Sequence, residues 1–132
     1  MTNLTKNFTL KEFKCPVGGE PKGELLQNVQ KLANNLQVLR EAVGKPITII
    51  SGYRSPEYNQ KIDGAKQSQH MFARAADIKI PGLTPVQVYE AVLKLIKEGK
   101  MEDGGLGLYE TFVHYDVRGV KARWFGTGVT YP

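Results

Sequence analysis

The longest periodic segment of the chain is the feature that most constrains its fold. Between about Pro21 and Val43, apolar residues recur at every third or fourth position, and Gly44 follows the last of them. This spacing predicts one apolar face of a long amphipathic helix, and glycine is a typical residue just past a helix end. In a chain of 132 residues this face needs a partner layer, so we expect one domain spanning residues 1–132. The residues of the face are Leu25, Leu26, Val29, Leu32, Leu36, Leu39 and Val43.

Shorter segments predict the rest of the fold. Helical segments are expected at about 9–13, 55–62 and 84–97; the second has a proline near its first position and the third begins with Thr84 as a cap. Strands are expected at 46–50, 75–80, 106–109, 112–117 and 122–125. The run Pro46–Ile50 is short and β-branched, which predicts a buried strand. Helices come first and strands cluster late, so we expect an α+β fold: a small antiparallel sheet with flanking helices.

The cysteine count limits the kinds of metal site that are available. Cys15 is the one cysteine of the chain, so neither an intramolecular disulfide nor a zinc site of several thiolates can form. A metal ion would have to be held by imidazole and carboxylate groups.

Charge and hydropathy narrow the classes of partner. Eighteen Lys and Arg residues against 13 Asp and Glu residues give a net charge of +5, which suits an anionic partner. The basic residues are scattered and no nucleic-acid motif accompanies them, so we expect a solubilising surface charge and no nucleic-acid partner. No apolar run approaches the roughly 20 residues of a membrane span. The first residues, Met1–Lys6, lack the apolar stretch of a secretory signal, so we expect synthesis in the cytoplasm.

Two histidines and one acid form the most informative polar pattern. His70 precedes the strand predicted at 75–80, Asp77 lies within that strand, and His114 lies within the strand predicted at 112–117. If these strands are neighbours, two nitrogens and one oxygen converge, a donor set that suits zinc with a fourth position left for water. The alternatives are that the histidines are structural or surface residues and that Asp77 faces solvent on an edge strand.

Several motifs in a fixed order carry a resemblance to a known family. They are Ser51–Ser55 (SGYRS), Ser68–His70 followed by Ala75–Ile78, Gly104–Gly107 (GGLG), and Phe112–Asp116 (FVHYD) followed by Ala122–Trp124. From about Phe8 to Trp124 the chain resembles the zinc D-Ala-D-Ala carboxypeptidase family, which includes cell-wall carboxypeptidases, vancomycin-resistance dipeptidases and phage endolysin peptidases.

The resemblance implies a fold, a cofactor and a substrate class. The fold is the one these peptidases share with the hedgehog signalling domain, and the ligands of a Zn²⁺ ion are His70, Asp77 and His114. The reaction is hydrolysis of peptide bonds with D-residues in bacterial peptidoglycan, by a D,D- or L,D-carboxypeptidase or endopeptidase. A monomer without membrane insertion is expected, acting on the wall after release or delivery, as in a phage lysin.

The general base departs from the family pattern. Many relatives place an acid three residues before the last histidine, where this chain has Thr111. Asp116 and Glu110 lie two and four residues from His114, so strand alternation would put both on its face. The alternatives are that Asp116 orients a ligand imidazole or an arginine and that Glu110 is a solvent-facing turn residue. The missing acid also leaves a second function open, a non-catalytic wall-binding or structural module that keeps the fold and the zinc.

The resemblance also points to residues that contact substrate. Arg54 matches an arginine that binds substrate or stabilises the oxyanion, although a surface arginine paired with an acid is the alternative. Ser68 can hydrogen-bond substrate, and Tyr109 and Trp124 can line the groove unless they belong to the core. At Ala73 relatives usually carry glycine; if φ is positive there, alanine costs about 1 kcal/mol and a small loop adjustment is expected.

Overall fold

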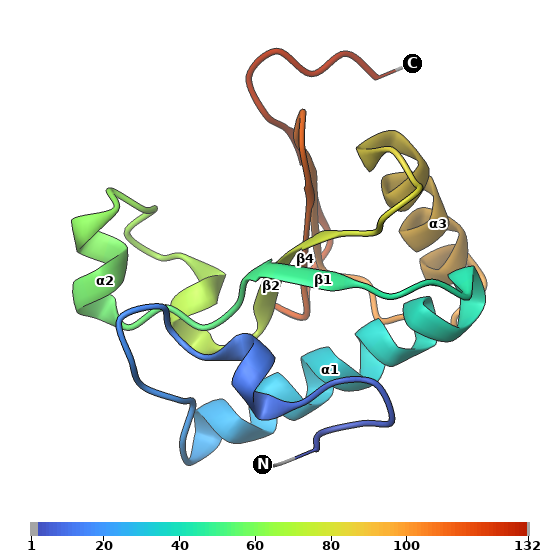
Figure 1. Cartoon of the computed structure of the whole chain (residues 1–132). Helices are drawn as coiled ribbons and strands as arrows, with labels where there is room; N and C mark the ends of the chain where they lie inside the picture. The colour runs from blue at the N-terminus through green and yellow to red at the C-terminus, as the bar shows by residue number, and fades with distance from the viewer. Residues whose placement is uncertain (1–2, 132) are drawn as a thin grey trace.

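The computed structural model describes residues 3–131 of the chain. Within this range, helices and 3₁₀ turns combine with five strands, which is an α+β architecture (Figure 1). The elements are η1 (Leu10–Phe13), α1 (Glu24–Val43), β1 (Thr48–Ser51), α2 (Pro56–Lys61), η2 (Gln69–Phe72), β2 (Ala75–Lys79), α3 (Pro85–Lys97), β3 (Gly105–Leu108), β4 (Val113–Asp116) and β5 (Ala122–Phe125). The α+β class expected from the sequence is therefore confirmed.

Local signals set the ends of the long helices. Helix α1 ends at Gly44, which adopts the left-handed conformation (φ 66°) and donates its N–H to the Arg40 carbonyl oxygen. It begins three residues later than the apolar spacing predicts, because Gly23 (φ 60°) turns the chain immediately before it. Helix α3 begins with a capping box, in which the Thr84 hydroxyl accepts from the Gln87 N–H and the Gln87 side chain accepts from the Thr84 N–H.

The sheet has the strand order β1-β2-β4-β3-β5. Neighbouring strands are antiparallel except β3 and β5, which are parallel. The small antiparallel sheet expected from the sequence is therefore confirmed, with one parallel pair at its last strand. After β4 the chain crosses to the far side of β3 rather than turning back along β4, and Ala122 N–H donates to the Gly104 carbonyl oxygen at that crossing.

The strand predicted as buried at 46–50 is an edge strand. Strand β1 pairs with β2 alone and alternates exposed and half-buried residues, with Ile50 48% exposed. Ile47, just before β1, and Ile49 point toward the core, whereas Thr48 and Ile50 face away from it. A short β-branched run has the same appearance in an edge strand as in a central one, which is why the prediction of burial failed.

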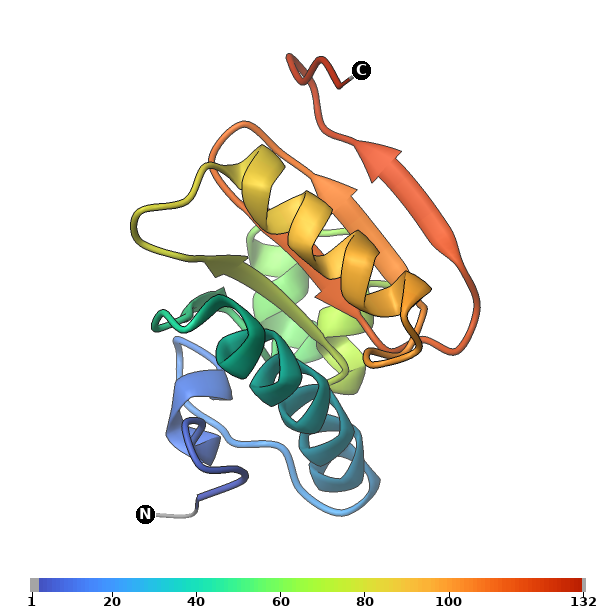
Figure 2. The same ribbon diagram turned by 90° about the vertical axis from the view of Figure 1, so that its right-hand side faces the viewer.

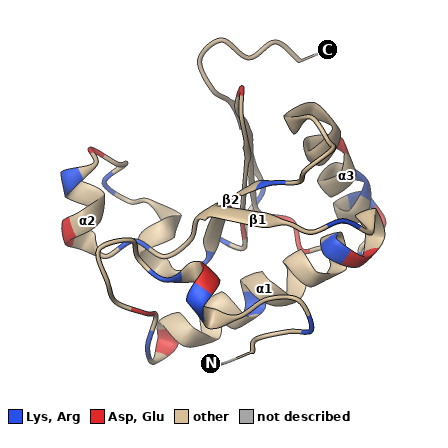
Figure 3. Ribbon diagram, in the orientation of Figure 1, with Lys and Arg blue, Asp and Glu red and all other residues tan. Residues whose placement is uncertain are grey.

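Helices α1 and α3 cover one face of the sheet, and α2 with η2 lies on the other side (Figures 1 and 2). The core forms where the covered face meets these two helices, through Leu32 and Leu36 of α1, Val92 of α3, and Ile78 and Leu106 of the sheet. Basic positions occur both on α2 and on α3, at opposite sides of the molecule (Figure 3), which agrees with the scattered charge of the sequence. Among the described residues, no helix combines the length and the apolar character needed to cross a bilayer.

Candidate metal centre

The uncovered face of the sheet carries a row of side chains in direct cross-strand register. Asp77 of β2 lies opposite His114 of β4, His114 lies opposite Gly107 of β3, and Gly107 lies opposite Trp124 of β5. Their neighbours in β2, β3 and β4 point into the core, because side chains alternate between the two faces. The predicted metal site required the strands of Asp77 and His114 to be neighbours, and β2 and β4 are paired directly.

His70 reaches this row from η2. The Ser68 hydroxyl caps the turn by accepting from the His70 N–H (3.2 Å). At the other end of the turn, Ala73 adopts the left-handed conformation (φ 56°), the backbone expected if glycine is the usual residue there. The His70 imidazole is buried, and its Nδ1 lies 2.7 Å from the Gly52 carbonyl oxygen. Nδ1 therefore carries the proton and Nε2 is left free to bind a metal.

The three side chains form a cluster with the dimensions of a metal site. His70 Nε2 lies 3.3 Å and His114 Nδ1 lies 3.1 Å from the same oxygen, Oδ1 of Asp77. One ligand atom from each residue lies within 4.8 Å of the others. Zinc bonds of about 2.0–2.1 Å in a tetrahedron place neighbouring ligand atoms about 3.3–3.4 Å apart. The donor set and its spacing therefore fit a zinc ion held by His70 Nε2, Asp77 Oδ1 and His114 Nδ1.

Asp116 contacts the nitrogen of the His114 ring that faces away from Asp77. The His114 Nε2 lies 2.7 Å from Asp116 Oδ2, so the ring donates to the carboxylate and turns Nδ1 toward Asp77. Asp116 also accepts from the Gly105 N–H and from the Arg118 guanidinium through Nε and Nη2. Its side chain is 0% exposed and lies outside the lining of the pocket over the cluster. This placement corresponds to the alternative role, an acid that orients a ligand imidazole.

The charges of this cluster hold one another in their ionised forms. Burial raises the pKa of Asp77, but the imidazoles of His114 and His70, whose nitrogens lie 3.1 and 3.3 Å from Oδ1, outweigh it and hold that pKa well below its ordinary value. Burial likewise raises the pKa of Asp116, and hydrogen bonds from His114 and Arg118 lower it further than burial raises it. For His114, burial lowers the pKa, and hydrogen bonds to Asp116 and Asp77 raise it above its ordinary value. The Asp77 carboxylate is therefore ionised, as a metal ligand must be.

The structure places Glu110 away from the cluster. Glu110 and Thr111 lie in the bend between β3 and β4, and β4 begins only at Val113, so strand alternation does not extend back to Glu110. Glu110 is exposed, lies beside Gly128 and lines a separate pocket. Thr111 also lies outside the lining of the pocket over the cluster.

A pocket of about 450 Å³ opens over the three candidate ligands. Within the described part of the chain, the one carboxylate in its lining is that of Asp77. Arg118 also lines this pocket, and sequence reasoning missed it; the signal was an arginine two residues after Asp116. The other lining residues are Arg54, Ala65, Gln67, Ser68, Gln69, Tyr109, Phe112 and Trp124.

Arg54 lies at the mouth of the cluster. Its Nη2 is 3.5 Å from Asp77 Oδ2, the oxygen not shared with the histidines, and its Nε donates to the Ser51 hydroxyl. Arg54 therefore pairs with an acid, and that acid belongs to the candidate metal site itself. Its guanidinium borders the pocket, where it can meet a carboxylate or a developing oxyanion.

Tyr109 and Trp124 form an aromatic wall of the same pocket. The Trp124 Nε1 donates to the Tyr109 hydroxyl (2.7 Å), and the Trp124 ring lies 5.0 Å from the His114 ring. Tyr109 stacks on Phe112 at 4.5 Å between ring centroids. Gly107 makes room for this wall, because a Cβ at that position would overlap the indole of Trp124.

We expect Gly107→Ala to displace Trp124 and to destabilise the protein by about 1–3 kcal/mol, as overpacking does. The measurement is the free energy of unfolding together with the emission of Trp124, the one tryptophan of the chain. In a Trp124→Leu background the added methyl group meets a smaller side chain, so its cost should fall markedly. An equal cost in both backgrounds would contradict the role assigned to Gly107.

Comparisons with known proteins give a family and curated relatives. A family model described as Peptidase M15 matches residues 6–116. The chain is 48% identical over 44 residues to a zinc D-Ala-D-Ala carboxypeptidase of Streptomyces albus G, a match that covers 33% of this chain and 17% of that protein. It is 34% identical over 87 residues to the peptidoglycan L,D-endopeptidase MepK of Escherichia coli, a match that covers 61% of this chain and 44% of that protein. The matched regions thus span less than half the length of these curated relatives.

Proposed function

The chain belongs to the peptidase M15 family, and on that premise we propose that it is a zinc metallopeptidase that hydrolyses peptide bonds of bacterial peptidoglycan. The observation that carries the proposal is the cluster of His70, Asp77 and His114 at the floor of an open pocket. A zinc ion bound there would activate water as a nucleophile near neutral pH and polarise the scissile carbonyl.

The residues around the cluster take separate roles in this proposal. Gly52 and Asp116 fix the orientation of the two ligand imidazoles, one through each ring nitrogen that faces away from the metal position. Arg54 binds a substrate carboxylate or the oxyanion that develops during hydrolysis. Tyr109 and Trp124 flank the peptide, and Ser68 shapes the pocket chiefly as the cap of η2, since its hydroxyl already accepts from His70.

The substrate follows from the names of the relatives. One is a D-Ala-D-Ala carboxypeptidase and the other an L,D-endopeptidase of peptidoglycan, so peptides with D-residues are the class to test. Whether this chain cleaves a D,D or an L,D bond, and whether within or at the end of a peptide, is decided by the products formed. Action on the wall in a phage-lysin setting stays a prediction from the resemblance.

One observation favours a second function, a wall-binding module that retains the zinc. The pocket lining contains no carboxylate besides Asp77 within residues 3–131, so a separate proton acceptor of the usual kind is absent from it. Asp116 is saturated with hydrogen bonds, and Glu110 lies in a neighbouring pocket. A module of this kind would bind stem peptides without changing them.

The deciding experiment is hydrolysis of defined peptidoglycan peptides by the zinc-loaded protein. The substrates are a stem pentapeptide ending in D-Ala-D-Ala, the corresponding tetrapeptide and a crosslinked dimer, with products identified by mass. We expect cleavage that stops when a chelator removes the metal and returns when zinc is restored. Binding of the peptides by zinc-loaded protein with no product would instead establish the wall-binding module.

A further inference from the structure

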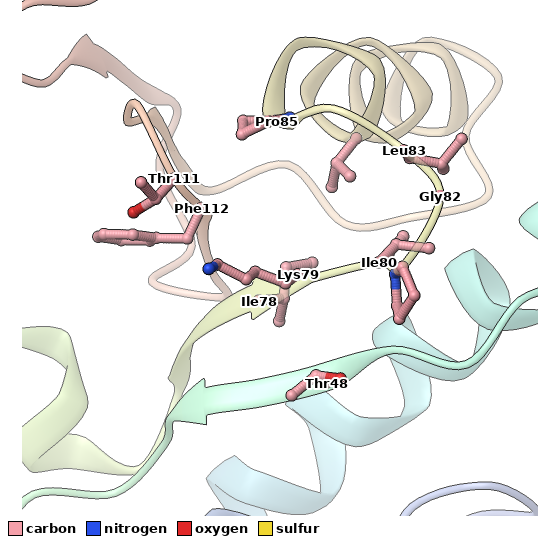
Figure 4. Close-up of a pocket in the computed structure, with 11 residues that line it drawn as sticks. Thr48, Ile78, Lys79, Ile80, Gly82, Leu83, Pro85, Thr111 and Phe112 are labelled. Carbon is pink, nitrogen blue, oxygen red and sulfur yellow. The ribbon is translucent and has the colours of Figure 1, made fainter.

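A second pocket adjoins the candidate metal centre. It encloses about 340 Å³ at the end of β2, where the chain turns toward α3 (Figure 4). Phe112 lines both this pocket and the one over the metal ligands, so the two are neighbours across a single aromatic side chain. The stacking of Phe112 on Tyr109 holds that shared wall in place. A peptide that lies over the metal centre and continues past Phe112 would enter the second pocket.

The register of the sheet shows on which side of the candidate metal ligands this pocket lies. In the β1–β2 pair, Ser51 lies opposite Asp77, and Thr48 lies opposite Lys79. Arg54 follows Ser51 beyond the end of β1, so Arg54 and Lys79 lie on opposite sides of Asp77 along β2. Lys79 is about 6.6 Å from Asp77 along the strand and its side chain starts on the same face.

The second pocket combines an apolar floor with a basic rim. Ile78, Leu83 and Val88 contribute apolar surface, and within the part of the chain that the structure describes, no Asp or Glu lines the pocket. Lys79 is exposed, and Figure 4 shows its ammonium group turned toward Phe112. Lys45 Nζ reaches within 3.5 Å of the position that a Cβ on Gly82 would occupy, at the other side of the rim.

Neither lysine forms an ion pair with another residue of the range 3–131. The ion pairs found among residues 3–131 involve other cations, so Lys79 and Lys45 present free positive charge to whatever enters the pocket. An anionic group on an otherwise partly apolar ligand is the complement of such a rim.

We propose that this pocket is a distal subsite that binds a free carboxylate of the substrate peptide, with Lys79 as its main contact. The inference rests on the proposed function for the peptide itself. An extended peptide advances about 3.3–3.6 Å per residue, so the carboxylate belongs to a residue about two or three positions from the scissile bond. Because Arg54 lies on the opposite side of Asp77, this is a second anionic group, distinct from one that binds Arg54. In a stem peptide the α-carboxylate of the γ-linked D-glutamate has this chemistry.

The test compares two stem peptides that differ in one group. In one the α-carboxyl of D-glutamate is free, and in the other it is amidated. Affinity for both is measured by calorimetry on zinc-loaded protein, and kcat/KM where product forms, for the wild type, Lys79→Gln and Lys79→Glu. We expect the wild type to prefer the free acid about 3- to 10-fold, Lys79→Gln to abolish the preference, and Lys79→Glu to reverse it. The matched control is Lys97→Gln, at the far end of α3, about 18 Å along that helix from Pro85.

The outcomes separate the subsite from the proposed function. If neither peptide is cleaved but binding discriminates acid from amide through Lys79, the subsite stands and the peptidase proposal fails. If the wild type cleaves both peptides equally well, the subsite is overturned while the peptidase proposal stands. If it binds both equally and cleaves neither, the subsite and the peptidase proposal both fail. An equal loss for both peptides in Lys79→Gln, or the same loss of preference in Lys97→Gln, would also overturn it.

Discussion

Replacing His114 by alanine is expected to reduce the zinc content from about one ion per chain to nearly none and peptide hydrolysis by at least about a thousandfold. The reason is the geometry of the cluster. His114 Nδ1 and His70 Nε2 both lie against Asp77 Oδ1, so the loss of one imidazole leaves two ligand atoms for the metal. Loss of residues that only support ligands typically costs 10- to 100-fold, so loss of a ligand should cost more. Zinc content is measured on protein purified without added metal.

A second variant guards against an effect of folding. Asp77→Asn keeps the size of the side chain and the strand pairing but removes the charge that zinc needs, so it should lose the metal as well. Wild-type protein stripped with a chelator and reloaded with zinc should recover its activity, whereas neither variant should. Retention of one zinc ion by a folded His114→Ala protein, with unchanged affinity, would contradict the three-ligand assignment.

The parts of the fold that the sequence predicts are those with a strong local signal. The apolar face between Leu25 and Val43 and the glycine after it predict α1 to its last residue. Strand partners have no such signal, because the period of two that marks a strand is the same for every neighbour. The edge position of β1 and the parallel pairing of β5 with β3 follow instead from how the connections cross the sheet.

The same limit explains which site residues could be predicted. Asp77 and His114 carry polar groups at buried positions of two predicted strands, so their meeting required only that the strands be neighbours. Glu110 and Asp116 look equivalent by counting from His114, but β4 begins at Val113 and leaves Glu110 in a bend. The burial of Asp116 and its pairing with Arg118 depend on Gly105, whose missing side chain leaves room for the carboxylate and guanidinium. Such a contact between strands cannot be seen in either strand alone.

Asp116→Asn is expected to destabilise the metal-free protein by about 2–4 kcal/mol at neutral pH. The Asp116 side chain is 0% exposed, and it is the carboxylate on which Arg118 (2.7 Å from Nη2) and His114 (2.7 Å from Nε2) converge. The amide of an asparagine in its place leaves the Arg118 guanidinium without a counter-charge. One N–H group of that amide must also face another hydrogen-bond donor. The Arg118 side chain is 24% exposed and can regain some water, which places the expected loss below that of a fully buried pair.

The pH dependence of unfolding tests whether loss of the Asp116 charge causes this destabilisation. The pKa of Asp116 is held below its ordinary value in the folded protein, so its contribution is fully present above the unfolded pKa of about 3.9. That contribution is lost as pH falls through the folded pKa. The difference in unfolding free energy between wild type and Asp116→Asn should therefore be largest between about pH 4 and pH 6.5 and shrink below about pH 4. It should shrink again as pH rises through the pKa of His114, which the hydrogen bond to Asp116 helps to raise. A difference that stays unchanged down to pH 2 would assign the loss to packing instead.

Asp103→Asn is the matched control for this prediction. Arg123 contacts Asp103 at 2.7 Å, the same distance as in the buried pair, but the Asp103 side chain is 40% exposed and Arg123 also donates to the Gly104 carbonyl oxygen. Solvent screens this pair, so its loss should cost less than about 1 kcal/mol. Asp116→Asn should also weaken zinc binding by about 10- to 100-fold, because it frees the ring of His114 to turn, whereas Asp103→Asn should leave zinc affinity unchanged. Equal effects of the two substitutions would show that burial beside the metal ligands confers no special role on Asp116.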